Sequence, residues 1–277
     1  MAPRLASYLA AAVLLIAPAS PAFATWSVIA VDQKTRQVVI ASATCVPQGA
    51  FAGFPAKGLM DVQAIVVPGK GVAAAQAGVD RTRKNQQLIF DEIAKGTDPG
   101  RILEMLKEDP QVDIRQFAIV DLQGRMTGFS GQKNMAASLS RQQQVPGTGI
   151  YFSIQGNILA SDDVVTAAMT AFAEAKGTLA DRVMAAMETA DAKGGDKRCT
   201  CASTPLTKAT AACTNKTSHV AYILRADAGD KTGAAFNDGT YAMYVAVTNE
   251  DITAAENANP VTTLRLRYDA WKKAHPQ

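Results

Sequence analysis

The pattern of hydrophobic and polar positions predicts strands and helices in groups. Residues 25–31 alternate with a period of two, and a β-branched run at 38–41 follows the polar segment 32–36. Such a pattern predicts a β-hairpin over residues 25–45. Further strands are expected at 63–67, 71–78, 116–121, 126–130, 220–224 and 241–247.

Apolar residues three or four positions apart predict the helices. Asp98 and Ser161 are suited to cap two of them, and Gly194 with Gly195 is suited to end another. Residues 47–61 have the Gly/Pro/Ala composition of a loop. The helices are expected at 83–95, from 99, from 162, from 179 and at 264–272.

The order of these elements is strands, two helices, strands, two helices, strands and a terminal helix. It does not alternate strand and helix, so a doubly wound parallel sheet is not expected. We predict an α+β fold in which helices cover mainly antiparallel sheets. The chain has no internal repeat and no long linker, which favours a single domain over residues 25–277.

The first 24 residues have the features of a signal peptide. Arg4 precedes an apolar run at 5–17, and Ala22 and Ala24 flank Phe23 in the A-x-A pattern of a cleavage site. The run is too short to span a bilayer, although an uncleaved anchor is the alternative. We therefore expect cleavage after Ala24, a mature chain that begins at Thr25, and a periplasmic or secreted protein without a membrane segment.

The composition limits the classes of partner that are expected and indicates how the cysteines are bonded. The formal net charge of +3 and the lack of a basic run with aromatic residues argue against nucleic acid. Cys45, Cys199, Cys201 and Cys213 are expected to form disulfides in an exported protein. The spacing favours a local bridge from Cys213 to Cys199 or Cys201. The alternative is a zinc site, for which His219 is the nearby imidazole.

Most common catalytic motifs are missing from the chain. It contains no G-x-S-x-G, H-E-x-x-H, Walker or G-x-G-x-x-G motif. The two histidines are His219, beside a predicted strand, and His275, near the C-terminus. A triad would have to use His219, which is the less favoured interpretation.

Thr25 is the candidate that signal cleavage would create. A free N-terminal threonine carries an amine and a hydroxyl on one residue, so the amine can act as base while the hydroxyl attacks a carbonyl. The amine has a pKa near 8, which suits neutral pH. The alternative is that threonine is merely tolerated after the cleavage site and suits the start of a strand.

Several segments together resemble one known family. The stretch TWSVIAVDQKTRQVVIASA at 25–43 resembles the start of the Ntn-hydrolase-like family catalogued as domain of unknown function 1028. The similarity extends over nearly all of residues 25–272. The other segments that carry it are DIRQFAIVDLQGRMTGFSG, QGNILAS, GGDKRC and NPVTTLRLRYDAWK.

The resemblance implies a four-layer αββα sandwich of the N-terminal-nucleophile hydrolase type. In that class Thr25 would be the nucleophile, and Lys57 would lie at a separation similar to the threonine–lysine spacing of proteasome-type subunits. An ordinary exposed lysine is the alternative for Lys57. Residues 199–216 look like a cysteine-containing insert, and 259–277 like a C-terminal helix and tail.

Other polar residues have a functional and a structural interpretation. Asn157, after Gln155 and Gly156, is a candidate oxyanion or substrate ligand, or part of a tight turn before a helix. Asp32 is a candidate binding residue or the close of the first hairpin. Asp196 belongs to a helix stop or to a ligand-binding loop.

We therefore expect an exported hydrolase that cleaves an amide or peptide-like bond with Thr25. A catalytically inactive binding or scaffold protein of the envelope is the alternative, and Ser27 after a different cleavage is a third. The substrate would be a small or peptide-like molecule, with no metal ligand and no cofactor assigned. A homo-oligomer is left open.

Overall fold

The computed structural model describes residues 25–53 and 58–276. Within these residues the chain forms a mixed α+β structure with two antiparallel sheets and six α-helices. No helix of this part is long and apolar enough to cross a membrane.

The larger sheet has six strands in the order β10-β9-β2-β1-β8-β7. All neighbours in it are antiparallel. The first strand thus lies in the interior of the sheet, between its hairpin partner and a strand from much later in the chain. The strands are β1 (Thr25–Asp32), β2 (Gln37–Thr44), β7 (Leu139–Gln144), β8 (Ile150–Asn157), β9 (Val220–Ala226) and β10 (Met243–Thr248).

The smaller sheet has four strands that follow one another in sequence and in space, in the order β3-β4-β5-β6. It is antiparallel throughout and stacks against the larger sheet, with β4 and β5 facing β1 and β8. Its strands are β3 (Ala64–Val67), β4 (Gly71–Ala77), β5 (Arg115–Asp121) and β6 (Met126–Ser130).

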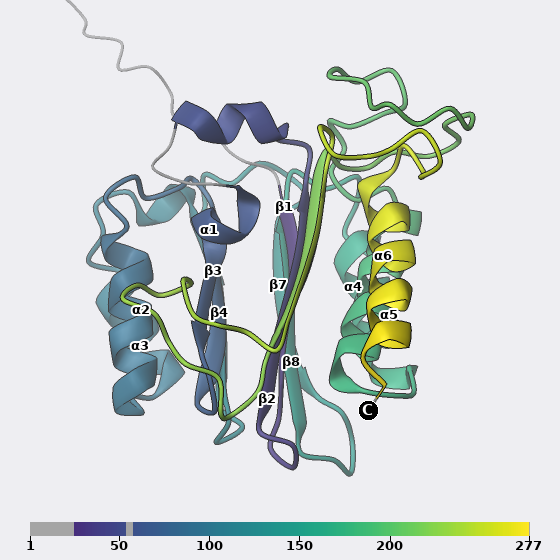
Figure 1. Ribbon diagram of the computed structural model, residues 1–277. Coiled ribbons are helices and arrows are strands. Elements are labelled where there is room, and N and C mark those ends of the chain that lie inside the picture. The colour runs from purple at the N-terminus through teal and green to yellow at the C-terminus, as the bar shows by residue number, and fades with distance from the viewer. Residues whose placement is uncertain (1–24, 54–57, 277) are drawn as a thin grey trace, which may run out of the picture.

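Helices cover the outer face of each sheet, which produces four layers (Figure 1). The pair α2 and α3 packs on the four-stranded sheet, and α4, α5 and α6 pack on the six-stranded sheet. The short α1 lies at one end of the space between the sheets. The bounds are α1 (Leu59–Gln63), α2 (Lys84–Lys95), α3 (Pro99–Leu106), α4 (Asp163–Glu174), α5 (Leu179–Ala192) and α6 (Pro260–Ala274).

The period-two pattern of β1 explains how its two faces become buried. Trp26, Val28 and Ala30 belong to the core between this sheet and its helices. Ile29 and Val31 belong to the core between the two sheets. A strand with both faces buried needs apolar residues at nearly every position, as β1 has from Val28 to Val31.

Local signals set several helix ends as the sequence predicts. The Asp98 side chain accepts a hydrogen bond from the Gly100 nitrogen, with Pro99 at the first helical position of α3. Gly96 ends α2 in the left-handed conformation. The cap expected at Ser161 is wrong by one residue: Asp162 precedes α4, and the Ser161 hydroxyl accepts from the Asp163 nitrogen.

Two strands were not predicted from the sequence. Residues 139–144 are polar and half-exposed at the edge of the sheet, so their hydrophobic pattern is weak. Residues 150–157 mix polar side chains with apolar ones, although most of β8 is buried. The terminal helix also begins earlier than expected, at Pro260, where the Asn259 side chain caps it. Residues 199–216 contain neither helix nor strand.

Candidate functional site

Thr25 begins an interior strand, and its side chain faces the other sheet. It pairs with Thr44 of β2 on one side and with Asn157 of β8 on the other. Because side chains alternate along a strand, Thr25 shares its face with Ser27 and Ile29, which point into the space between the sheets. Thr25 is 1% exposed in the full-length chain.

Thr25 forms hydrogen bonds with Asn157, Thr44 and Gln76. Its backbone nitrogen donates to Asn157 Oδ1 at 3.1 Å, and its hydroxyl donates to Thr44 Oγ1 at 3.2 Å. Its carbonyl accepts from Gln76 Nε2 at 3.0 Å. In the 277-residue chain the Thr25 nitrogen is a peptide nitrogen, and only cleavage of the bond to Ala24 makes it an amine.

The space between the sheets is polar at the Thr25 end and apolar at the other. At the apolar end, residues such as Val31, Val38 and Val72 form the core between the sheets. We call the buried polar residues at the first end the inter-sheet polar cluster. Its members are Thr25, Ser27, Thr44, Gln63, Gln76, Gln116, Gln155 and Asn157.

Gln76 of β4 is the centre of this cluster. Its Oε1 accepts from the Ser27 hydroxyl at 2.7 Å and from Gln63 Nε2 at 3.3 Å. Its Nε2 donates to the Thr25 carbonyl and, at 2.7 Å, to Gln116 Oε1. Gln116 in turn donates to the Gly156 carbonyl at 2.9 Å. The network thus joins the two sheets through amide groups that carry no charge.

Two acceptors in the cluster have no partner among the described residues. They are Gln63 Oε1 and Gln155 Oε1, both buried. Buried polar atoms are normally hydrogen-bonded, so such an atom needs an explanation, for example a water or a ligand. An N–H or O–H donor would satisfy both atoms.

The structure brings Gln155, Gly156 and Asn157 to the candidate site. They form the C-terminal end of β8, so their interpretation as a tight turn is wrong. Gln155 Nε2 donates to the Ala74 carbonyl in the facing sheet at 3.2 Å. A Cβ on Gly156 would lie 2.7 Å from Leu159 Cδ1, which explains glycine at this position.

Asp196 is fully buried and holds a loop beside the end of β2. Its Oδ2 accepts from the Cys45 nitrogen at 2.9 Å and forms a salt bridge with Arg198 at 2.8 Å. Its backbone also forms an isolated antiparallel β-bridge with Leu159, two residues after β8. These contacts support the interpretation of Asp196 as a structural residue near the site.

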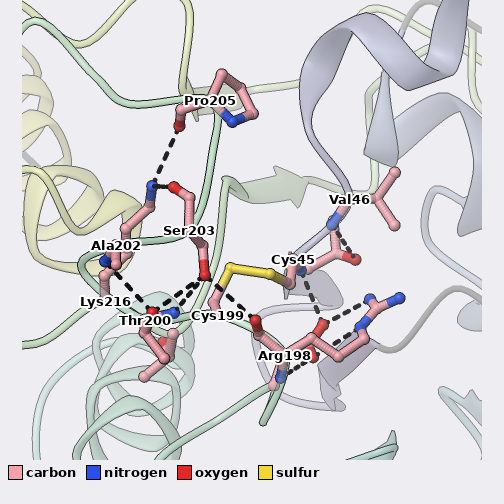
Figure 2. The surroundings of a disulfide bond; sticks show 12 residues. Cys45, Val46, Arg198, Cys199, Thr200, Ala202, Ser203, Pro205 and Lys216 are labelled. Atoms are coloured by element: carbon pink, nitrogen blue, oxygen red, sulfur yellow. Dashed lines mark hydrogen bonds and ion pairs between the residues drawn. A yellow bond between two sulfur atoms is a disulfide. The ribbon is translucent and has the colours of Figure 1, made fainter.

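Two disulfides order the segment after Asp196. Cys201 is bonded to Cys213, one of the two local bridges expected from the spacing. Cys45 is bonded to Cys199, a long-range pair that the sequence did not indicate. Figure 2 shows the Cys45–Cys199 bridge, with Lys216 pointing at the carbonyls of Ser203 and Pro205. Two disulfides are typical of a protein outside the cytoplasm.

His219 lies beside the Cys45–Cys199 bridge and is 2% exposed. Its backbone nitrogen donates to the Thr44 carbonyl at 2.7 Å. Burial lowers the pKa of its imidazole to about 4, and the nearby charge of Lys216 acts in the same direction. The ring is therefore neutral at pH 7.

Asp32, a candidate binding residue, does not join the site. Asp32 lies at the opposite end of β1, where its carboxylate accepts from the Lys34 nitrogen and the Thr35 hydroxyl and closes the hairpin. Lys57 lies outside the described residues. Asp113, Arg115 and Gln116 lie close together in the sequence at the start of a predicted strand, which suggests a functional polar cluster or, as the favoured alternative, a structural ion pair. Gln116 belongs to the inter-sheet polar cluster. The actual partner of Arg115 is Asp109, at 2.9 Å.

A groove opens on the same face of the large sheet. Two adjoining cavities of about 210 and 360 Å³ share Met60, Asp61 and Tyr244. The smaller one reaches Val220, the partner of Thr44, so the groove begins two strands from Thr25, a distance of about 10 Å. Thr25 itself does not line this groove.

Tyr222 gives the groove a polar atom. Its hydroxyl is buried and has no hydrogen-bond partner among the described residues. Burial raises the pKa of this phenol well above its usual value, so it stays protonated. Tyr222 and Tyr244 lie with ring centroids 6.2 Å apart. Tyr222 and Tyr244 thus give the groove two aromatic rings, and Asp61 lines both cavities beside them.

Comparison with known proteins places the chain in a family. A model of a family of unknown function, DUF1028, matches residues 25–235. The chain belongs to DUF1028. The match begins at Thr25, the residue that starts β1 and lies in the inter-sheet polar cluster.

A solved structure of this family has the same fold. The crystal structure of protein SPO2555 from Silicibacter pomeroyi, described as DUF1028, is similar with a TM-score of 0.62 and 18% sequence identity. The similarity covers 90% of this chain and 89% of that one. At this identity the comparison supports the fold alone. No curated protein matches the sequence.

Proposed function

We propose that the mature protein is an exported hydrolase of the N-terminal-nucleophile type, which cleaves an amide or peptide-like bond with Thr25. The observation that carries the proposal is the position of Thr25. It begins an interior strand of a stacked pair of sheets, with its nitrogen and hydroxyl in a polar cluster. The family match that starts at the same residue supports it.

The proposed chemistry uses one residue twice. Cleavage after Ala24 gives Thr25 an amine, which takes the hydroxyl proton as the oxygen attacks the substrate carbonyl. The resulting oxyanion needs N–H donors, and a candidate is the side-chain amide of Asn157, whose oxygen accepts from the Thr25 nitrogen. The amine then protonates the leaving nitrogen, and water hydrolyses the ester on Thr25. The four layers are consistent with this class of fold.

The groove beside β9 is the proposed place for the rest of the substrate. Its volume suits part of a small ligand, and its lining of Tyr222, Tyr244 and Met60 suits an apolar or aromatic group. The Tyr222 hydroxyl would then bond a polar atom of that group. Tyr222→Phe is expected to raise KM more than it lowers kcat.

A scaffold without activity is the second candidate, and a specific observation favours it. Thr25 is 1% exposed in the full-length chain, and it does not line the groove that would hold a ligand. A nucleophile must lie within reach of the bond that it attacks. An Ntn-type sandwich that binds a ligand in the groove, without cleaving it, would fit the same contacts.

The experiment starts with N-terminal sequencing of the exported protein, which we expect to begin at Thr25. Wild type, Thr25→Ala, Thr25→Ser and Ser27→Ala are then assayed on a panel of N-acyl amides and peptide anilides. Ser27 is the matched control, because it is a buried hydroxyl on the same strand face.

We expect Thr25→Ala to lower kcat by at least about a thousandfold, while Thr25→Ser and Ser27→Ala keep measurable activity. Activity should rise with pH through the pKa of the amine, near 8. A mature start at another residue, or equal activity of Thr25→Ala and wild type, would refute the threonine mechanism. Ligand binding without turnover in all variants would favour the scaffold.

A further inference from the structure

Three potential metal ligands meet beside the end of β2. The ligand atoms of Cys45, Cys199 and His219 all lie within 4.8 Å of one another. They come from three separate parts of the chain, which the fold brings together. Among the described residues this is the one such group of three.

The histidine has the character of a ligand rather than of a satisfied core residue. His219 is 2% exposed, and its Nδ1 has no hydrogen-bond partner within the described part of the chain. A buried ring nitrogen without a partner is unfavourable, and a metal ion would accept its lone pair. The backbone on both sides is held, because the His219 nitrogen bonds the Thr44 carbonyl and Val220 begins β9.

The spacing fits a tetrahedral zinc ion once the sulfurs separate. Zinc–sulfur bonds of about 2.3 Å and zinc–nitrogen bonds of about 2.0 Å place ligand atoms about 3.5 to 3.8 Å apart in a tetrahedron. Ligand atoms that already lie within 4.8 Å therefore need only small side-chain rotations. A water molecule would complete the tetrahedron.

The local charges favour thiolates at this place. Lys216 is buried near His219, and Arg198 directly precedes Cys199 in the chain. Cationic neighbours of this kind stabilise cysteine thiolates. Two thiolates and a neutral imidazole around Zn²⁺ carry no net charge. The charge of Arg198 is balanced by Asp196 at 2.8 Å, so among the described residues Lys216 is the unbalanced cation near the site.

We propose that Cys45, Cys199 and His219 form a zinc site when the Cys45–Cys199 disulfide is reduced. The reductant is a dithiol, which gives two electrons and two protons to the disulfide and becomes a disulfide itself. Zn²⁺ then replaces the protons of the two thiols, and both protons leave to solvent. The site thus exchanges a covalent bridge for a metal bridge between the same two segments.

The second disulfide provides an internal control. Cys201 and Cys213 are also bonded, but they belong to no group of three ligands in the described residues. A Cys201→Ser/Cys213→Ser variant keeps only the proposed site. A Cys45→Ser/Cys199→Ser variant keeps only the control pair.

The test uses the exported protein, reduced with a dithiol under anaerobic conditions and freed of reductant. Each variant is titrated with Co²⁺, whose visible absorption reports tetrahedral coordination and whose charge-transfer bands report thiolates. Zn²⁺ is then added to displace it. We expect wild type and Cys201→Ser/Cys213→Ser to bind one Co²⁺ per chain with tetrahedral bands. Cys45→Ser/Cys199→Ser should not, and His219→Gln should bind at least about tenfold more weakly.

The proposal fails if reduced Cys201→Ser/Cys213→Ser does not bind Co²⁺, or if Cys45→Ser/Cys199→Ser binds equally well. Unchanged affinity and bands in His219→Gln would overturn the role of the histidine. Circular dichroism checks the fold of each reduced sample. Should reduction unfold the chain, the site must restore the spectrum when Zn²⁺ is added, and failure to do so also refutes it.

Discussion

Replacing Gln76 by methionine tests whether the inter-sheet polar cluster is as tightly connected as its contacts indicate. Methionine has a similar length but neither donates nor accepts comparable hydrogen bonds. The change removes the acceptor of the Ser27 hydroxyl and of Gln63 Nε2. It also removes the donor to Gln116 Oε1 and to the Thr25 carbonyl. Gln76 is 4% exposed, so water has little access to these groups.

The expected loss in the free energy of unfolding follows from the number of buried polar groups that Gln76→Met leaves without partners. Each buried polar group that loses its partner costs about 1 to 3 kcal/mol. Four such groups in the lower half of this range, less the gain from burying an apolar side chain, give a loss of about 3 to 5 kcal/mol. Since typical domains have a free energy of unfolding of about 5 to 15 kcal/mol, this loss would be a large share of the total.

Urea unfolding measures this loss, with the fluorescence of the buried Trp26 as one probe and circular dichroism as a second. Gln143→Met on the exposed side of β7 is the control, and its effect should stay within about 0.5 kcal/mol. A loss below about 1 kcal/mol for Gln76→Met, at an unchanged slope m, would mean that water reaches the cluster. The account of a dry network between the sheets would then be wrong.

Two further results are expected. The Cys45–Cys199 disulfide spans 154 residues, and its removal should lower the free energy of unfolding by about 5 kcal/mol. The Cys201–Cys213 disulfide spans 12 residues, and its removal should lower it by about 3 kcal/mol. Equal losses in urea unfolding of the two double-serine variants would contradict the argument from loop entropy. The second result concerns acid. Burial raises the pKa of Asp181, but hydrogen bonds from Lys272 and Thr178 outweigh it and hold the pKa at about 2. Because the folded pKa is below the unfolded value of 3.8, this stabilisation is present above pH 3.8 and is lost as pH falls towards 2. Asp181→Asn should be less stable than wild type by about 1 to 2 kcal/mol at pH 5, and the difference should shrink at pH 2.5; a constant difference would remove the carboxylate from the explanation.

Most helices and strands were predicted from the sequence, because the interactions that start and end them involve residues close together in the chain. The alternation in β1, the Asp98 cap and the Gly96 stop act within a few residues. The same holds for Cys201–Cys213, which closes a short loop. The resemblance to domain of unknown function 1028 was confirmed by the match over residues 25–235.

The candidate site was predicted only in part. Thr25 and Asn157 were singled out, and the structure places them side by side in the sheet. The sequence did not indicate Gln76 or Gln63 as site residues, because glutamines next to apolar residues are common in protein sequences. Their importance comes from burial between two sheets, which no local pattern encodes.

By itself, the sequence determined the period of β1, the ends of several helices, the family and the presence of a threonine after a cleavage-site pattern. Only the tertiary structure decided that β8 lies beside β1, that Cys45 reaches Cys199, and that glutamines from both sheets satisfy one another. The reason is physical. A buried amide must find its partner, but any residue that the fold brings within about 3 Å can supply it, however far away along the chain.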